Sequence, residues 1–286
     1  MNVAGKKRDV ERVLTDTHAH LDFPQLQADF TGVLQRAAAA GVSRLVTIGT
    51  SAEGSRRSLA LAEQYDHVFA VAGVHPNNAA VEPPGAVEIL RTLAENPRVV
   101  ALGEMGLDYH YLPSTRGGSA EDDAANKRIQ ADVFRAQLDL AAELHLPVVI
   151  HERDAWEDTV AILGEYTGRV RAVFHCFGKS PAHAEAVLAL GHLVSFTGIV
   201  TFKNAEVVQQ TAKAIRADQF MVETDCPYLA PIPYRGKTCE PAHVRNTAEF
   251  IAQLRGVSLE EMAASTTAVA DAFFRFPGTR HGSPSK

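Results

Sequence analysis

Two histidines one residue apart, His18 and His20, stand near the start of the first apolar segment of this 286-residue chain. Side chains two residues apart in a β-strand point to the same face of a sheet, so the two imidazoles would meet at one point. Imidazole nitrogens are common ligands of divalent metal ions. The pair therefore indicates half of a metal site, for which the rest of the chain must supply further ligands.

Four more residues with metal-binding side chains end short apolar runs. They are Glu104, His151, His175 and Asp225. The alternation of a strand predicts that the apolar residue two positions before a ligand shares its inward face. For three of the four ligands these residues are Leu102, Val149 and Val173. A polar side chain at the end of an apolar inward row is the pattern expected of a site at the mouth of a barrel.

Short β-branched and apolar runs alternate with longer helical patterns along the chain. Eight runs are predicted to be strands: 13–20, 44–50, 68–75, 99–104, 147–151, 172–175, 193–196 and 220–225. Helices are predicted at 30–40, 55–65, 86–95, 125–144, 181–190, 241–255 and 258–275. Eight such units predict a (β/α)8 TIM barrel of the α/β class. A doubly wound open sheet is less favoured, because no Gly-x-Gly-x-x-Gly follows the first strand.

One catalytic barrel domain is expected over residues 13–276, between a solvated tail at 1–12 and a disordered Pro/Gly/Ser-rich tail at 277–286. Residues 113–126, rich in Gly, Ser and acidic side chains, are expected to form a loop after the fourth strand. No apolar run approaches the roughly 20 residues of a membrane helix. No apolar signal region follows the basic N-terminus, so we expect a cytoplasmic protein.

The composition limits the partners and the chemistry. A net charge of −6 disfavours broad binding to duplex phosphates, so a nucleic-acid substrate would need a local basic patch and metal. The three cysteines, Cys176, Cys226 and Cys239, form no Cys-x-x-Cys pair, which argues against disulfides and a thiolate zinc site. Strand alternation directs Cys176 and Cys226 away from the neighbouring ligands and toward the helices.

Catalytic side chains of a barrel sit at the carboxyl ends of its strands, so the six ligands should converge at one mouth. Four histidines and two carboxylates suit Zn²⁺ or Mn²⁺, with Mg²⁺ where oxygen ligands dominate. Six ligands exceed the usual three of a catalytic zinc, which favours two ions with Glu104 as the bridging carboxylate. Two ions activate a water and clamp the oxygens of a phosphodiester. Asp225 is then a ligand or the base that orients this water.

Four other residues near the strand ends are candidates for substrate binding. His75 ends the third strand and would contact a phosphate or support a ligand. Tyr109 and Arg153 follow the fourth and fifth strands, where the ring could stack on a base and the guanidinium could grip a phosphate. Arg235 follows the eighth strand, a region where barrel enzymes often bind phosphate. For each of them, a structural role within its loop is the alternative.

The segments around these residues resemble the motifs of the TatD family of metal-dependent deoxyribonucleases. They are residues 16–22, 73–76, 103–109, 149–155, 174–177, 223–231 and 233–241, and the resemblance extends from about 14 to about 275. It implies an amidohydrolase-type barrel with 3′-to-5′ deoxyribonuclease activity, a Mg²⁺, Mn²⁺ or Zn²⁺ cofactor and a role in DNA repair. The metal ligands that it implies are His18, His20, Glu104, His151, His175 and Asp225.

The primary hypothesis is therefore a two-metal phosphodiesterase that removes nucleotides from single-stranded or frayed DNA ends. An amidohydrolase of C–N or aminoacyl ester bonds is the first alternative, because the same metals can activate water to attack a carbonyl. A non-catalytic scaffold whose metals only stabilise the fold is the second. No membrane partner is expected. The sequence leaves the oligomeric state open, with a monomer as the working expectation.

Overall fold

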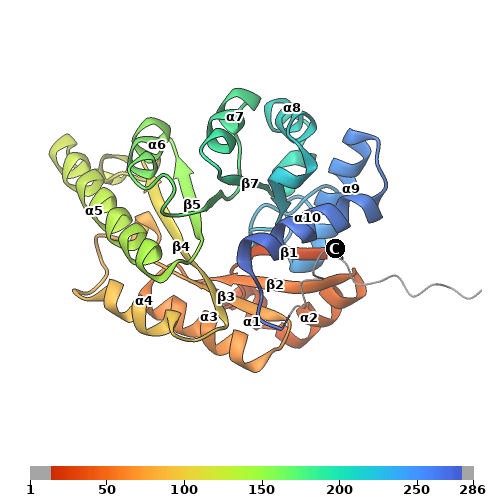
Figure 1. Ribbon diagram of the computed structural model, residues 1–286, viewed down its shortest axis with the longest axis horizontal. Coiled ribbons are helices and arrows are strands. Elements are labelled where there is room, and N and C mark those ends of the chain that lie inside the picture. Colours follow the sequence, from red (N-terminus) through yellow and green to blue (C-terminus); the bar gives the residue numbers. More distant parts are fainter. Residues whose placement is uncertain (1–13, 279–286) are drawn as a thin grey trace, which may run out of the picture.

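The computed structural model describes residues 14–278, which form a nearly closed barrel of eight parallel strands surrounded by helices (Figure 1). The strands are β1 (Leu14–Ala19), β2 (Val42–Ile48), β3 (Val68–Ala72), β4 (Val99–Asp108), β5 (Val148–Arg153), β6 (Ala172–Phe174), β7 (Leu193–Phe196) and β8 (Phe220–Val222). They pair in chain order, and an isolated parallel bridge between Ala19 and Cys226 joins the first strand to the segment after the last. The predicted (β/α)8 barrel is confirmed.

Ten α-helices and five short 3₁₀ helices connect the strands within residues 14–278. The α-helices are α1 (Pro24–Gln27), α2 (Phe30–Ala39), α3 (Ala52–Gln64), α4 (Ala86–Ala94), α5 (Ala120–Leu144), α6 (Trp156–Gly164), α7 (Pro181–Ala189), α8 (Glu206–Ala214), α9 (Val244–Arg255) and α10 (Leu259–Phe274). The 3₁₀ helices are η1 (Pro76–Asn78), η2 (Pro113–Arg116), η3 (Gly198–Thr201), η4 (Ala217–Gln219) and η5 (Pro241–His243). Figure 1 shows the α-helices arranged as a ring outside the strands.

Three helices lie where the sequence analysis predicted none: α1, α6 and α8. The two longer ones begin without a usual start signal, because their N-cap residues are Ala155 and Ala205 and neither has a side chain that caps the helix. Ser, Thr, Asp or Asn at the N-cap is the usual sequence signal for the start of a helix. These helices form because their apolar residues, such as Ile162 and Val208, are buried against the barrel.

Helix α5 begins earlier than predicted, at Ala120 instead of residue 125, so the expected loop over 113–126 is only partly a loop. The hydroxyl of Ser119 accepts a hydrogen bond from the backbone N–H of Asp122, and the Asp122 carboxylate accepts one from the N–H of Ser119. This capping box and the acidic first turn stabilise the helix N-terminus. The acidic residues that suggested a loop are thus the start of the helix.

Two hydrophobic clusters hold the barrel together, one inside it and one beneath the helices. The inner cluster contains residues from β2 to β8 and is closed at one end by Phe273, Phe274 and Phe276, from α10 and the segment after it. The outer cluster packs the other faces of the strands against helix residues such as Phe134 and Leu138 of α5. Val149 and Val173 belong to the inner cluster, as predicted.

The predicted inward position of Leu102 is wrong, because it belongs to the outer cluster with the helices. The pairing of β4 with β5 shifts register between Leu102 and Met105, which interrupts the strict alternation. Gly103 has a φ of +133°, and a Cβ there would lie 2.5 Å from the carbonyl oxygen of Val149. The glycine therefore permits the close approach that turns Glu104 inward although Leu102 faces out.

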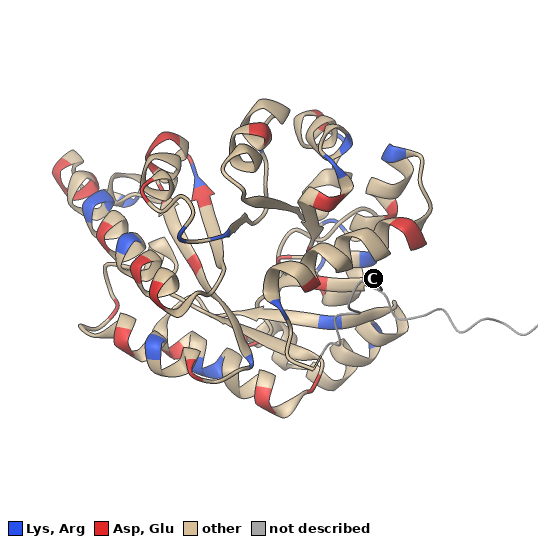
Figure 2. Cartoon of the chain, in the orientation of Figure 1, with Lys and Arg blue, Asp and Glu red and all other residues tan. Residues whose placement is uncertain are grey.

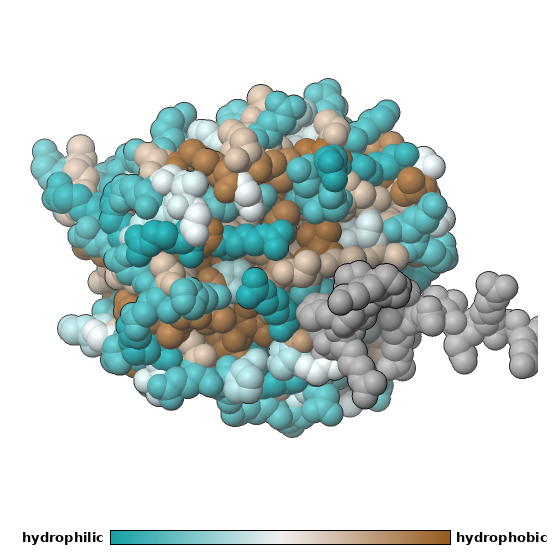
Figure 3. All heavy atoms as spheres, viewed as in Figure 1, coloured by the Kyte–Doolittle hydropathy of each residue, from teal (hydrophilic) through white to brown (hydrophobic). Residues whose placement is uncertain are grey.

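Positions of both charge signs are interspersed along the outer helices (Figure 2), and hydrophilic residues cover most of the face seen in Figure 3. No helix within residues 14–278 is both long and apolar enough to cross a membrane. The tails expected at 1–12 and 277–286 lie outside the described residues, except that 277 and 278 form a turn.

Replacement of the α5 cap tests the early helix start. Ser119→Ala should lower the free energy of unfolding by about 1 kcal/mol, because the N–H of Asp122 loses its acceptor. Urea denaturation measures the change. Ser114→Ala, at an exposed site on η2, is the control and should change stability by less than about 0.5 kcal/mol. Equal effects of the two substitutions would contradict the capping box.

Candidate metal centre

The six predicted ligands converge at the carboxyl end of the barrel. His18 lies in β1, Glu104 in β4 and His151 in β5. His20, His175 and Asp225 lie just beyond the ends of β1, β6 and β8. Strands β4 and β5 continue past their predicted ends to Asp108 and Arg153. Their ligands are therefore held within the sheet and not in loops.

One group of ligands comes from the seam between the first and last strands. The Nε2 atom of His20 lies 3.2 Å from Oδ1 of Asp225, and that of His18 lies 3.6 Å from the same oxygen. The seam itself is held by backbone hydrogen bonds, because Asp225 donates to the carbonyl of His18 and His20 to that of Cys226. These three side chains are close enough to share one metal ion.

Glu104 joins this group to a second one across the mouth. Its Oε2 lies 3.5 Å from Nε2 of His18, and its Oε1 lies 2.7 Å from both Nδ1 of His151 and Nε2 of His175. His18, Glu104 and His175 also have ligand atoms close enough for one ion. The carboxylate thus faces both groups, which is the position of a bridging ligand.

The donor set fits one or more divalent cations. Both ring nitrogens of His18 and Nδ1 of His175 are buried and have no hydrogen-bond partner within the described part of the chain. Burial of a polar atom without a partner costs roughly 1–3 kcal/mol. A cation would satisfy the inward-facing Nε2 of His18 directly, and histidine with carboxylate oxygen is a usual donor set for Zn²⁺ or Mn²⁺.

The charges of the centre favour an ionised Glu104. Burial alone would raise its pKa, but the neighbouring His175, His75 and His151 outweigh burial and hold the pKa well below its usual value. Burial likewise opposes charge on His175, yet Glu104 and Glu223 raise its pKa well above the ordinary value. The cluster therefore holds an anion at its centre that must be balanced by protons or by metal.

Two buried carboxylates that the sequence analysis did not identify support the ligands from behind. Glu223 accepts hydrogen bonds from the N–H of Cys176 and the hydroxyl of Ser195, both at 2.6 Å, and lies 3.7 Å from Nδ1 of His175. Asp16 accepts from the N–H and the hydroxyl of Thr224, and burial raises its pKa to about 8. A carboxylate in the position of Glu223 orients a metal-binding histidine, whereas Asp16 joins β1 to the segment after β8.

The strand periodicity contained the signal for both carboxylates. Asp16 stands two residues before His18, and Glu223 stands two residues before Asp225. The alternation that selected the histidine pair therefore applies to them as well. A search limited to the last residues of the predicted strands misses both, because Asp16 and Glu223 lie within the strands predicted at 13–20 and 220–225.

His75 approaches the centre from beyond β3. Its Nε2 lies 3.2 Å from Nδ1 of His151 and 3.5 Å from Oε1 of Glu104. Asp108 approaches the imidazole of His151 from the other side, with 3.3 Å between its Oδ2 and Nε2 of His151. The same Oδ2 accepts a hydrogen bond from Nδ2 of Asn77, at 3.0 Å. Burial lowers the pKa of His75 to about 3, so this ring is neutral near pH 7.

Five of the six ligands line a cavity of about 810 Å³, and His18 is fully buried behind them. Beyond the ligand cluster, its wall includes Arg153, Tyr111 and Tyr228. Arg153 lies over the ring of Tyr111, with 4.9 Å between the guanidinium carbon and the ring centroid. The cavity therefore combines buried metal-binding groups with exposed aromatic and cationic groups at its rim.

Two of the predicted substrate contacts are not brought to this cavity. The hydroxyl of Tyr109 donates to Asp158, and Lys127 lies over its ring. Arg235 lies over the ring of Phe202, at 4.3 Å. Among residues 14–278, those that line the cavity around Glu104 do not include Tyr109 or Arg235. His75 and Arg153 do line it.

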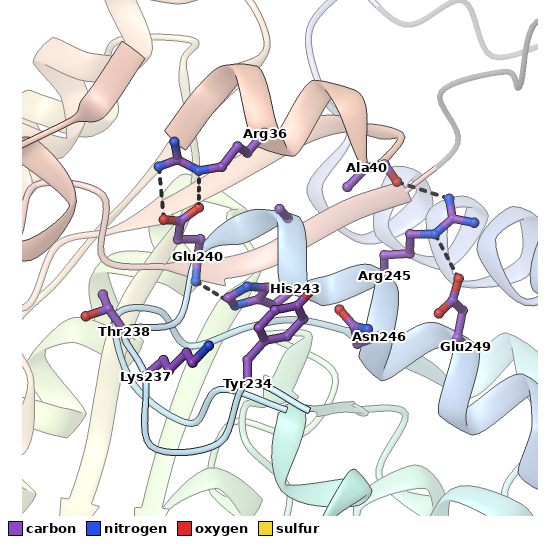
Figure 4. A pocket seen from close by; sticks show the side chains of 11 residues that line it. Arg36, Ala40, Tyr234, Lys237, Thr238, Glu240, His243, Arg245, Asn246 and Glu249 are labelled. Carbon is purple, nitrogen blue, oxygen red and sulfur yellow. Dashed lines mark hydrogen bonds and ion pairs between the residues drawn. The ribbon is translucent and has the colours of Figure 1, made fainter. Parts of the chain in front are cut away.

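A second cavity, of about 500 Å³, lies beside α2 and α9 and includes Tyr234 and Lys237 of the segment after β8 (Figure 4). Its two carboxylates are each paired with an arginine, Glu240 with Arg36 and Glu249 with Arg245, which neutralises them. The ring of Tyr234 stacks on that of His243. The metal-binding groups found in residues 14–278 are all at the other cavity.

The predicted direction of Cys176 is wrong, whereas Cys226 is buried as expected. Cys176 lines the cavity of the metal centre because the backbone turns at this residue, with a φ of +48°, just past the end of β6. Burial raises the pKa of its thiol to about 12, so it is not a thiolate near neutral pH. All three cysteines are free.

Comparison with known proteins gives a consistent relationship over nearly the whole chain. A family model described as TatD related DNase matches residues 15–275. The metal-dependent hydrolase YabD of Bacillus subtilis is 40% identical over 92% of this chain and 99% of its own length. The 3'-5' ssDNA/RNA exonuclease TatD of Erwinia amylovora is 36% identical over 91% of this chain and 98% of its own.

Solved structures agree with the sequence relatives. The TatD homologue YJJV of Escherichia coli superposes with a TM-score of 0.83 at 28% identity, over 92% of this chain and 98% of that one. An amidohydrolase of Burkholderia multivorans with bound zinc has a TM-score of 0.63 at 14% identity, over 93% of this chain and 100% of that chain. The second likeness extends to the barrel fold alone.

Glu223→Gln tests the support behind His175. We expect metal affinity to fall about 10- to 100-fold, because an amide orients the imidazole less strongly than a carboxylate. Competition with a chromogenic chelator measures this affinity. Glu165→Gln, at an exposed glutamate paired with Arg135, is the matched control and should leave it unchanged. An unaltered affinity in Glu223→Gln would remove this role from Glu223.

Proposed function

The chain belongs to the family of TatD-related DNases, whose relatives are metal-dependent hydrolases, and from this premise we propose that it removes nucleotides from the 3′ ends of single-stranded DNA. The bond cleaved is a phosphodiester. The name of the Erwinia relative, an exonuclease of single-stranded DNA and RNA, supports this direction and substrate. The same name makes RNA ends a further substrate to test.

The position of Glu104 is the observation that carries the proposal. Its two carboxylate oxygens face different groups, with His18 on one side and with His151 and His175 on the other. We propose that His18, His20, Glu104, His151, His175 and Asp225 hold two divalent ions, with Glu104 between them. Two ions at this centre would activate a water and neutralise the charge that develops on the phosphoryl oxygens.

Side chains of this protein would accept the proton and bind the phosphate. Asp225, a carboxylate whose pKa is lowered by His20 and His18 against the effect of burial, accepts a proton from the attacking water. Arg153, at the rim of the same cavity, pairs with a phosphate of the bound strand. Nδ1 of His75 accepts a hydrogen bond from the N–H of Asn77, so the neutral ring carries its proton on Nε2 and would donate it to a phosphate oxygen. Arg235 and Tyr109 lie away from the cavity wall and would meet only a longer strand.

The net charge of −6 fits a substrate that is gripped locally at its end. Unpaired or frayed ends suit a cavity of about 810 Å³ at the barrel mouth, which the end of a single strand can enter. A part in DNA repair and a location in the cytoplasm stay predictions of the sequence analysis, as does a monomeric state. Comparison of the cleavage rates in Mg²⁺, Mn²⁺ and Zn²⁺ identifies which of these metals supports the activity.

Glu104→Ala and Asp225→Ala should abolish metal-dependent cleavage. The first removes the carboxylate between the two histidine groups, and the second removes the proposed proton acceptor, so rates should fall by at least about 10³-fold. Digestion of a 5′-labelled single-stranded oligonucleotide in Mg²⁺, Mn²⁺ or Zn²⁺ measures the activity. Circular dichroism measures whether the variants fold.

The control is Glu88→Ala, at a helix residue outside the cavity, which should keep full activity. Full activity in a folded Glu104→Ala or Asp225→Ala protein would contradict the mechanism. Turnover of cyclic amides or aminoacyl esters without turnover of DNA would instead favour an amidohydrolase. Metal that raises the melting temperature while no substrate is cleaved would favour a scaffold.

A further inference from the structure

We propose that Tyr228 is a stacking platform for the terminal base of the substrate strand, which makes an unpaired base part of what the centre recognises. This inference rests on the proposed function. It assigns to one exposed ring a preference for single-stranded ends, because bound metal ions and Arg153 would act on the phosphate and would not contact the base.

Tyr228 stands beside the reacting groups. It follows Asp225 by three residues, and its backbone N–H donates to the carbonyl of Asp225. Its side chain lines the cavity that contains Glu104, yet half of its surface, 50%, is exposed to solvent. The ring therefore offers an accessible aromatic face next to the reacting groups, on which a flat ligand can stack.

The ring is held in place from one side. Phe23 meets it edge-on, with 6.1 Å between centroids, and Phe23 itself stacks on the metal-side histidine His20 at 4.9 Å. The backbone around it is constrained as well, because Leu229 adopts a left-handed conformation with a φ of +54°. A ring fixed beforehand loses little conformational entropy when a flat partner stacks on it.

The opposite rim of the cavity has a different chemistry. Tyr111 follows β4, which lies half-way round the barrel from β8. Arg153 and Arg116 both approach its ring, at 4.9 and 5.8 Å. This rim presents cations, whereas the β8 rim presents an uncharged aromatic face. A nucleotide placed across the centre would put its base on Tyr228 and the next phosphate toward Arg153.

Stacking on Tyr228 explains why the end must be unpaired. The terminal base of a duplex is paired with its partner and stacked on the base pair beneath it, so it can turn onto a ring beside Glu104 only after leaving both. A free terminal base has an open face, and stacking on an aromatic residue tolerates every base. The expected recognition is therefore independent of sequence and specific for single-stranded ends.

The test combines two substrates with three enzymes and one control variant. The substrates are oligothymidylates that end in a normal 3′ nucleotide or in a tetrahydrofuran residue, which lacks the base. The enzymes are the Mn²⁺-loaded wild type, Tyr228→Leu and Tyr228→Phe. Tyr234→Leu is the matched control, since Tyr234 is an exposed tyrosine of the same segment that faces the other cavity.

We expect Tyr228→Leu to lower kcat/KM on the normal end about tenfold, mainly through KM, and Tyr228→Phe to preserve it. On the end without a base, Tyr228→Leu and the wild type should be equal, because there is nothing to stack. Tyr234→Leu should match the wild type on both substrates. Equal losses of Tyr228→Leu on both substrates, or no loss on either, would overturn the platform.

Calorimetric binding to the same Mn²⁺-loaded proteins separates this inference from the proposed function. The wild type should bind thymidine 5′-monophosphate more tightly than deoxyribose 5-phosphate, and Tyr228→Leu should bind the two equally. If this pattern is found while no oligonucleotide is cleaved, the exonuclease proposal fails and the platform stands. If cleavage is normal while Tyr228→Leu still prefers the nucleotide, the platform is wrong.

Discussion

The ionised carboxylate of Glu104, buried among histidines at the barrel mouth, is the constraint to which the rest of the centre conforms. A buried charge is tolerated only when it is paired on every side. Here the pairing comes from β1, β5 and the end of β6, with 2.7 Å contacts to His151 and His175 and a 3.5 Å contact to His18. Side chains from strands that are far apart in the sequence therefore meet at one point. The resulting cluster contains the nitrogen and oxygen atoms that a metal ion needs as donors.

The geometry that turns Glu104 inward shows how the fold serves this point. A regular β4 would send Leu102 and Glu104 to the same side, yet Leu102 packs beneath the helices. The register shift beside Gly103 separates the two, and only glycine fits so close to the backbone of Val149. Behind the ligands, Glu223 and Asp16 tie the ends of β6, β7, β8 and β1 together. The precision of the site thus comes from the sheet, whereas the contacts proposed for substrate lie at the end of β5, for Arg153, and on the segments after β3 and β8, for His75 and Tyr228.

Much of the barrel and of the ligand cluster could be predicted from the sequence, because both depend on local periodicity. Short apolar runs separated by helical patterns indicate parallel strands, and the polar residue at the end of each run marks the mouth. The missed helices α6 and α8 lack a capping side chain, so tertiary burial and not a local signal defines them. The rim was predicted least well, since Tyr109 and Arg235 sit near strand ends in sequence but are turned to Asp158 and Phe202. Loop direction depends on backbone turns, such as that at Cys176, which composition does not encode.

The central claim is that Glu104 lies between two metal ions. Anomalous diffraction from crystals grown with Mn²⁺ or Zn²⁺, recorded above and below the absorption edge of the metal, tests it most directly. Two anomalous peaks roughly 3.5–4 Å apart are predicted, one near His18, His20 and Asp225 and one near His151 and His175, with the carboxylate of Glu104 touching both. A single peak that does not contact Glu104, or peaks elsewhere in the protein only, would contradict the claim.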